Sequence, residues 1–318
     1  MFVLDRRRLL IAGTALAALP IAGARAEQFV NVLTGGTAGV YYPLGVALAQ
    51  VYADTIPGVR TSAQSTKASV ENLNLLQGGK GEVGLVLGDS LIDAWKGVAD
   101  AGFKQPLDKL RGIAALYPNY VQVVALQESG IASLADLKGK RLSVGAPKSG
   151  TELNARTILK AAGLSYDDLG KVEYLPFAES VELMKNRQID ATLQSAGLGV
   201  ASIRDLAASV PITLVAVPAD LVTGIGSPYE VAEIPAGTYE GQAGAVTTAA
   251  IPNFLATHSE VPDDLVYAMT AQLFANLDKL VAAHNAAKVI SLDHALDGMP
   301  IPLHPGAERF YKEKGLLK

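Results

Sequence analysis

Short apolar runs rich in β-branched residues alternate along the chain with longer segments of helical periodicity. The run FVNVLTGG at Phe29–Gly36 predicts a strand that ends in glycines, followed by a helix with Pro43 in its first turn. Further on, Lys67–Gln77 predicts a helix and Glu82–Asp89 a strand, which leads into a helix beginning SLIDAWKGV. Strands that alternate with helices favour an α/β fold built in layers.

The same order of elements recurs later in the chain. A strand and glycine loop in RLSVGAPKSG lead to a helix closed by Gly163, and a helix in SVELMKNRQ precedes a strand in IDATLQSAG. The tripeptide Ser-Val-Glu opens a predicted helix in both places, at Ser69 and at Ser180. We interpret this echo as two related α/β lobes; the alternative is that strand–helix–strand units simply look alike.

Two apolar β-rich runs, Tyr117–Gly130 and Gly244–Thr257, are predicted to cross between the lobes. Two crossings make a hinge, and a hinge permits closure around a ligand. The predicted boundaries are residues 27–120 plus 250–318 for lobe 1 and residues 121–249 for lobe 2, so the C-terminal helices rejoin lobe 1. A long helical stretch is predicted over VPDDLVYAMTAQLFANLDKLVAAH, with its start marked by Pro262 and Asp263.

The N-terminal segment has the pattern of a secretory signal peptide. Arginines at Arg6–Arg8 precede the apolar stretch Leu9–Gly23, and the small-residue site Ala24–Ala26 predicts cleavage after Ala26. The apolar stretch is shorter than the roughly 20 residues that span a bilayer. The run DRRRLLI resembles a twin-arginine export signal, and an arginine-rich Sec signal is the alternative. Either route predicts a periplasmic protein.

Charge and composition narrow the function classes. Residues 1–26 carry four arginines and one aspartate, so their removal changes the formal net charge from −4 to −7 and leaves 292 residues. An acidic chain of this kind lacks the excess of basic residues that nucleic-acid-binding proteins use, so nucleic-acid binding is disfavoured. The chain has no cysteine, which excludes disulfides, thiolate metal sites and cysteine nucleophiles. The remaining length suggests two domains of about 150 residues each, and we expect a monomer.

Two glycine loops carry the clearest chemical signal. Thr34–Pro43 and Gly145–Glu152 each follow a predicted strand and precede a predicted helix. A helix start presents free backbone N–H groups and the positive end of the helix dipole, so such a loop binds anions without a lysine. The second loop has the spacing Gly145-x-x-x-x-Gly150, but its lysine is Lys148, inside the loop, which disfavours nucleotide binding. Each loop alone is also compatible with a tight turn.

Other candidate chemistry has simpler readings. The sequence GDSL at Gly88–Leu91 suggests an esterase with Ser90 as nucleophile, but none of the four histidines has the expected D-x-x-H context. Asp89 and Ser90 also suit a helix N-cap or a ligand contact. The histidines lack metal-ligand spacing, so we expect surface or capping roles for them and no metal or other cofactor. Glu152 and Arg156 are spaced for a solvated ion pair on a helix.

Several segments together resemble one family. They are LTGGTAGVYYPLG, STKASVENLNLL, VGAPKSGTELNAR, TTAAIPNFLAT and IPLHPGAERFYKEKG. In this order, and over essentially all of the mature chain, they resemble the TAXI family of solute receptors of tripartite ATP-independent periplasmic (TRAP) transporters. The resemblance implies a two-lobed periplasmic-binding-protein fold, type II-like, that closes on a small molecule and delivers it to a TRAP permease in the membrane.

The resemblance also implies ligand contacts. Carried over by position, they are Thr37, Tyr41, Tyr42, Ser65, Ser149, Gly150 and Thr151, with Gln194 and Ser195 as a weaker match. Lys67 occupies a position that is more often glycine in the family, and we add it as a candidate contact. A cation there would favour a glutamate-like amino acid or a C5 dicarboxylate such as 2-oxoglutarate over glutamine.

The sequence thus predicts a non-enzymatic receptor that sequesters a small organic anion between two lobes. Two alternatives stay open at this point. One is a ligand-presenting receptor for a sensor kinase, which would use the same closed state. The other is a periplasmic GDSL-type esterase that uses Ser90.

Overall fold

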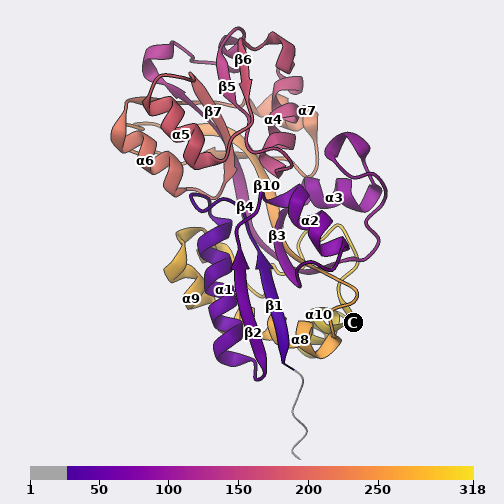
Figure 1. The fold of residues 1–318 in the computed structure, drawn as a ribbon. Helices are drawn as coiled ribbons and strands as arrows, with labels where there is room; N and C mark the ends of the chain where they lie inside the picture. The colour runs from indigo at the N-terminus through magenta and orange to yellow at the C-terminus, as the bar shows by residue number, and fades with distance from the viewer. Residues whose placement is uncertain (1–26) are drawn as a thin grey trace, which may run out of the picture.

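The computed structural model describes residues 27–318, so the predicted signal peptide lies outside the described part of the chain. Figure 1 shows an upper and a lower part, each built of helices around strands, with long strands running between them. Among the described residues, no helix is both long and apolar enough to cross a membrane.

The strands and helices alternate over most of the chain. The strands are β1 (Gln28–Leu33), β2 (Val59–Gln64), β3 (Val83–Leu87), β4 (Leu110–Leu126), β5 (Arg141–Ser143), β6 (Lys171–Glu173), β7 (Ala191–Ala196), β8 (Ile212–Val215), β9 (Glu230–Ile234) and β10 (Val246–His258). The α-helices are α1 (Tyr41–Thr55), α2 (Ser69–Gln77), α3 (Gly88–Lys96), α4 (Gly150–Ala161), α5 (Phe177–Lys185), α6 (Ala201–Ser209), α7 (Ala219–Ile225), α8 (Asp263–Ala275), α9 (Leu277–Ala283) and α10 (Pro305–Glu313).

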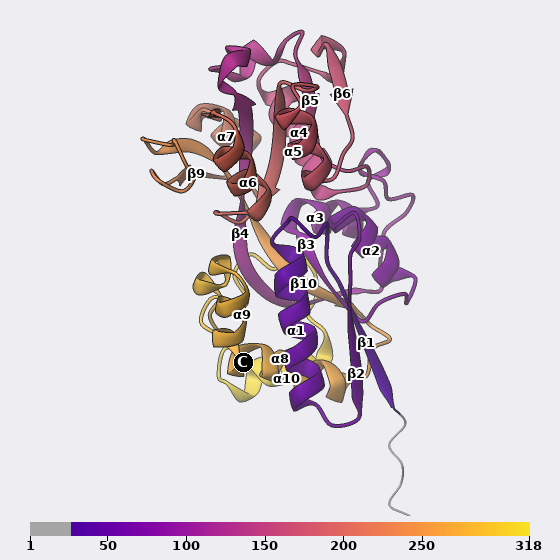
Figure 2. The same cartoon turned by 60° about the vertical axis from the view of Figure 1, so that its left-hand side comes forward.

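The sheet consists of two matching halves. In the lower half β1 pairs in parallel with β2 and β3, and β3 pairs antiparallel with β10. In the upper half β5 pairs in parallel with β6 and β7, and β7 pairs antiparallel with β4. β4 and β10 pair antiparallel with each other and join the halves (Figure 2). This topology confirms the predicted two-lobed α/β fold with two crossover strands.

Burial explains why the central strands are apolar. All residues of β3 and β7 are buried, as expected for inner strands that helices cover on both faces. The edge strand β2 instead alternates half-buried and exposed residues. α1 contributes Leu48 and Tyr52 to the main core, where they join Phe310 and Tyr311 of α10. The C-terminal helices α8 and α9 also pack against α1.

The helical stretch predicted after Pro262 forms as two consecutive helices, α8 and α9. Asn276 divides them, because it leaves the helical region and its side-chain amide donates to the carbonyl of Gln272 at 2.9 Å. Asparagine competes in this way for backbone hydrogen-bonding groups. The predicted echo of Ser-Val-Glu at two helix starts was wrong in its second copy. Ser69 does begin α2, but Ser180 lies one turn inside α5, whose start is set by Pro176 at the N-cap position.

The contact between α1 and β1 depends on a glycine. A Cβ atom at Gly45 would lie 2.2 Å from Cγ2 of Thr34. We expect Gly45→Ala to lower the free energy of unfolding by about 1–3 kcal/mol, because overpacking forces neighbouring side chains or backbone to shift. Chemical denaturation measures the change.

The matched control is Gly224→Ala, since Gly224 is an exposed helical glycine in α7 with nothing within 4 Å of its added Cβ. That variant should be neutral or stabilised by up to about 1 kcal/mol through helix propensity. Equal effects of the two substitutions would contradict the close-packing explanation.

Candidate functional site

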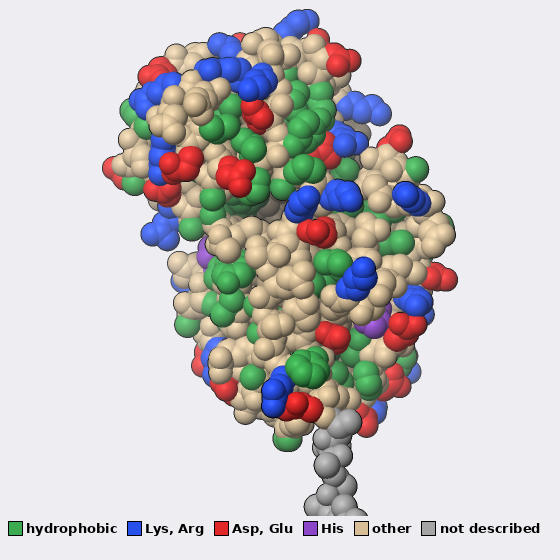
Figure 3. Space-filling model, in the orientation of Figure 1, with side chains coloured by type: hydrophobic (Ala, Val, Ile, Leu, Met, Phe, Trp, Pro, Cys, Tyr) green, Lys and Arg blue, Asp and Glu red, His purple; other side chains and the backbone are tan. Residues whose placement is uncertain are grey.

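A cavity of about 290 Å³ lies between the upper and lower parts of the molecule. Figure 3 shows this face hollowed at the boundary of the two parts, with lysine and arginine side chains beside it. Four segments that each follow a strand and precede a helix form most of the wall: Gly35–Tyr41, Ser65–Ser69, Ala146–Thr151 and Pro176–Glu179. The size is at the small end of ligand pockets, which hold about 300–1,000 Å³.

The wall segments bring four helix starts to one place. Helices α1 and α2 of the lower part and α4 and α5 of the upper part all begin at the cavity. The first N–H groups of a helix have no partner inside the helix, and the helix dipole is positive at that end. Four such ends around one small cavity favour an anionic ligand.

Hydroxyl groups hold the wall loops in shape. Oγ of Ser65 donates to the carbonyl of Gly35 at 2.9 Å, which ties the two lower loops together. Oγ of Ser149 accepts from the backbone N–H of Glu152 at 3.1 Å and so caps α4. Such a cap satisfies one of the orphan donors at the helix start and fixes the direction of the remaining ones.

A buried polar chain forms the hinge side of the cavity. Tyr41 donates its hydroxyl to Oδ1 of Asn253 on β10, and Nδ2 of Asn253 donates to Oδ1 of Asn119 on β4 at 2.8 Å. Nδ2 of Asn119 in turn donates to the carbonyl of Ser195 on β7 at 2.9 Å. Burial raises the pKa of Tyr41 far above its ordinary value, so its hydroxyl stays a donor. This series of hydrogen bonds connects Tyr41, a wall residue of the lower part, to Ser195, a wall residue of the upper part.

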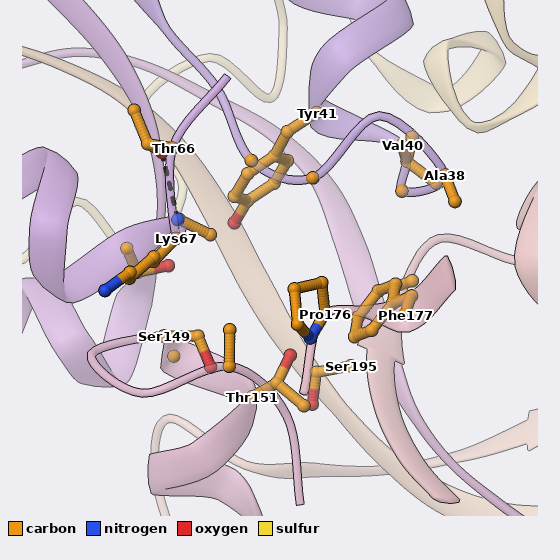
Figure 4. A pocket seen from close by; sticks show the side chains of 18 of the residues that line it. Ala38, Val40, Tyr41, Thr66, Lys67, Ser149, Thr151, Pro176, Phe177 and Ser195 are labelled. Atoms are coloured by element: carbon orange, nitrogen blue, oxygen red, sulfur yellow. Dashed lines mark hydrogen bonds between the residues drawn. The ribbon is translucent and has the colours of Figure 1, made fainter. Parts of the chain in front are cut away.

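The structure brings together most of the predicted contacts. Eight of the ten candidates line the cavity: Thr37, Tyr41, Ser65, Lys67, Ser149, Gly150, Thr151 and Ser195 (Figure 4). Tyr42 and Gln194 do not. Gln194 is fully buried and accepts from the hydroxyl of Ser202 at 2.6 Å, because successive strand residues point to opposite faces. The ligand-binding role of all ten residues stays a prediction.

The wall residues that were missed from the sequence include Asn119, Phe177 and Glu179. Asn119 is a polar residue inside the apolar run YPNYVQVVAL, and a polar residue in a buried strand could have indicated a site residue. Phe177 follows Pro176 at a helix start, a position that the predicted start at Ser180 had hidden. No local signal marked Glu179.

The charge of the wall is sparse and peripheral. Within the described residues that line the cavity, only Lys67 and Glu179 carry a charge, and both side chains are exposed. They come from opposite parts of the molecule. In Figure 4 the ammonium group of Lys67 lies at the edge of the site and points away from Tyr41 and Ser195. The helix starts, rather than a buried cation, therefore dominate the electrostatics of the cavity.

The two parts touch closely beside the cavity. A Cβ atom at Gly150 would lie 2.6 Å from Cδ1 of Leu87 and 3.0 Å from Oγ of Ser90, both from the lower part. The carbonyl of Lys148 accepts from the backbone N–H of Glu71 at 3.2 Å. Gly150 thus serves close approach between the parts as well as the loop itself.

The GDSL segment does not cap its helix. α3 begins at Gly88, after Leu87, so Asp89 and Ser90 lie in the first turn. Ser90 is buried, and its hydroxyl donates to Asp89 at 3.4 Å. The four histidines hydrogen-bond elsewhere; His284 and His304, for example, accept from backbone N–H groups and cap helices. The geometry therefore gives Ser90 neither an exposed position nor a histidine base.

The Glu152–Arg156 ion pair forms, with Nε 2.7 Å from Oε1, but it is not the solvated pair that we expected. The side chain of Glu152 is 5% exposed and also accepts from the hydroxyl of Tyr166 at 2.9 Å. Glu152 therefore anchors the first turn of α4 against the rest of the upper part.

Two α/β halves joined by crossover strands, with one cavity walled by helix starts from both halves, define the class of two-lobed solute-binding folds. The chain belongs to the NMT1-like family, which matches residues 32–315.

Solved structures show the same fold. PhnD1 from Prochlorococcus marinus in complex with methylphosphonate is 11% identical, with 92% of this chain and 100% of that chain covered and a TM-score of 0.59. A binding protein component of an ABC phosphonate transporter from Pseudomonas aeruginosa is 10% identical, with 82% and 79% covered and a TM-score of 0.53. A putative L-cystine ABC transporter from Listeria monocytogenes is 14% identical, with 84% and 98% covered and a TM-score of 0.51. At these identities the likeness concerns the fold alone.

Capping by Ser149 makes this residue structural as well as a candidate contact. We expect Ser149→Ala to lower the free energy of unfolding by about 1 kcal/mol, because the N–H of Glu152 loses its acceptor. Ser149→Gly should cost only a few tenths of a kcal/mol, since glycine is tolerated at the N-cap. Urea unfolding of both variants separates them, and equal losses would argue against the cap.

Proposed function

We propose that this chain is an extracytoplasmic solute-binding protein that captures a small organic anion between its two lobes. The convergence of four helix starts from both lobes on one cavity carries the proposal. A ligand that contacts both lobes binds the closed form best, so it shifts the population toward closure. Export directed by the predicted signal peptide, with cleavage after Ala26, would place the protein outside the cytoplasm.

The proposed ligand contacts are the backbone N–H groups at the helix starts together with the wall side chains. Thr37 and Tyr41 contribute from the lower lobe, and Gly150, Thr151 and Ser195 from the upper lobe. The ring of Tyr41 and that of Phe177 supply apolar surface for the carbon skeleton of a ligand. An anionic group would lie nearest the helix starts.

The ligand that we propose is a glutamate-like amino acid or a C5 dicarboxylate such as 2-oxoglutarate. The size of the cavity and the resemblance to TAXI receptors support it. A phosphonate is a second candidate, because a protein with the same fold binds methylphosphonate. Both are small anions, and the helix starts suit either.

The proposed partner is a membrane transporter. The resemblance of the sequence favours a TRAP permease, whereas two of the proteins with the same fold are described with ABC transporters. Presentation of the ligand to a sensor kinase would use the same closed state. Purified transporter subunits of both types, tested for ligand-dependent binding of this protein, would distinguish these partners.

A thermal-shift screen tests the ligand class. Ligands that bind only the folded state stabilise it, by about 2.7 kcal/mol at a hundredfold excess over Kd. We expect L-glutamate or 2-oxoglutarate to raise the melting temperature by several degrees, since 1 kcal/mol shifts the Tm of a chain of about 200 residues by roughly 2–4 °C. L-glutamine and methylphosphonate belong in the same screen. If none of the small anions in the screen raises the melting temperature, the result would contradict the proposed function.

Lys67 tests the anionic preference. Calorimetry should show that Lys67→Ala lowers the affinity for 2-oxoglutarate more than the affinity for L-glutamine, by up to about fivefold. The effect is small because an exposed charge contributes at most about 1 kcal/mol. Lys80→Ala is the matched control, since Lys80 is also exposed but lies off the cavity wall. Unchanged relative affinities in the Lys67 variant would remove this residue from ligand selection.

A further inference from the structure

A second polar cluster joins the lobes on the side of α3 and α4. Oδ2 of Asp89 on α3 accepts from Nδ2 of Asn154 on α4 at 2.5 Å and from the hydroxyl of Tyr229, just before β9, at 2.7 Å. Nδ2 of Asn154 also lies 2.8 Å from the hydroxyl oxygen of Tyr229. Asp89 comes from the half of the molecule that carries β1–β3, and its two partners come from the other half.

The carboxylate of Asp89 has only neutral partners. Among the described residues, no lysine, arginine or histidine forms an ion pair with it, and its other oxygen, Oδ1, accepts from the backbone N–H of Ser90 at 2.7 Å and from the Ser90 hydroxyl at 3.4 Å. Asn154 is fully buried and Tyr229 is 8% exposed. Burial raises the pKa of Asp89 to about 6, although the hydrogen bond from Tyr229 opposes that shift. A buried carboxylate without a cation requires these hydrogen bonds.

The cluster reaches the cavity through Asn154. Oδ1 of Asn154 accepts from the hydroxyl of Ser195 at 2.5 Å, and Ser195 lines the cavity. Because an amide oxygen only accepts, this bond fixes the orientation of Asn154, and its NH₂ group must face Asp89 and Tyr229. The hydrogen of Ser195 points at Asn154, so the hydroxyl oxygen of this wall residue can only accept further hydrogen bonds.

We propose that Asp89, Asn154 and Tyr229 form an interlobe latch, which holds the lobes closed and fixes the Ser195 hydroxyl at the cavity wall. Separation of the lobes breaks both bonds to Asp89 and returns its carboxylate to water. Closure remakes them and sets the position of Ser195. The latch itself needs no ligand, whereas the role of Ser195 toward a ligand rests on the proposed function.

Distance measurement on the ligand-free protein tests the latch. The chain has no cysteine, so Lys80→Cys on the lower lobe and Lys160→Cys at the end of α4 place two spin labels without background. Both lysines are exposed. Pulsed electron–electron double resonance then measures the distances between the two labels and so the closed and open populations. We expect Asp89→Ala and Tyr229→Phe each to lower the closed-to-open ratio by about tenfold, because a hydrogen bond to a charged group is lost.

Tyr166→Phe is the matched control, since the Tyr166 hydroxyl donates to Glu152 at 2.9 Å within the same lobe. It should leave the distance distribution unchanged. Melting temperatures of all variants check that each one folds. If Asp89→Ala does not fold, Tyr229→Phe still tests the latch. An unchanged closed fraction in Tyr229→Phe would overturn the latch. So would a wild-type distribution dominated by distances longer than in this structure.

A second arm uses L-glutamate as the probe in calorimetry. Tyr229→Phe should weaken its binding, and Tyr166→Phe should not. Equal affinity of wild type and Tyr229→Phe for L-glutamate would overturn the link from latch to cavity. If wild type does not bind L-glutamate at all, the proposed ligand class is wrong, while the distance measurement still decides the latch.

Discussion

The pairing of β4 with β10 is the constraint on which the rest of the structure depends, because these two strands alone continue from one half-sheet into the other. At the crossing Pro118 faces Pro252, and neither can donate to the strand ladder. The side-chain amides of the adjacent Asn119 and Asn253 hydrogen-bond to each other instead. The ladder is thus interrupted at the two prolines, where side chains supply a hydrogen bond, and its register shifts again between Leu255 and Ala256. Such irregular pairing suits a hinge between two half-sheets.

The cavity follows from this topology. Each half-sheet carries parallel strands whose carboxyl ends point toward the other half, and the loops that leave them lead directly into helices. Ligand sites of open α/β sheets lie at such strand ends. Here two sets of strand ends face each other, so helix starts from both halves surround one small space. The positive potential of the site therefore comes from the backbone and needs no buried lysine.

Contacts between the lobes combine close packing with polar groups. Gly150 allows α4 to approach Leu87, and the Asp89 cluster lies one turn further along the same helix. The polar network from Tyr41 to Ser195 runs through Asn253 and Asn119 of the two crossover strands. Ser195 is common to both networks. Water replaces polar contacts of this kind when the lobes separate, so each bond favours closure by only about 0.5–3 kcal/mol, and the interface can still open.

The sequence by itself determined the α/β class, the crossing strands, most helix positions and both glycine loops, because periodicity, glycine and proline act locally. It marked the segment after Pro262 as helical but not its division at Asn276, where one side chain competes for a backbone carbonyl. Only the tertiary structure decided which side chains face the cavity, as with Ser195 against Gln194, and which distant groups meet. Asp89 binds Tyr229, which is 140 residues away, and that pairing depends on strand order and lobe contact, for which no local pattern exists.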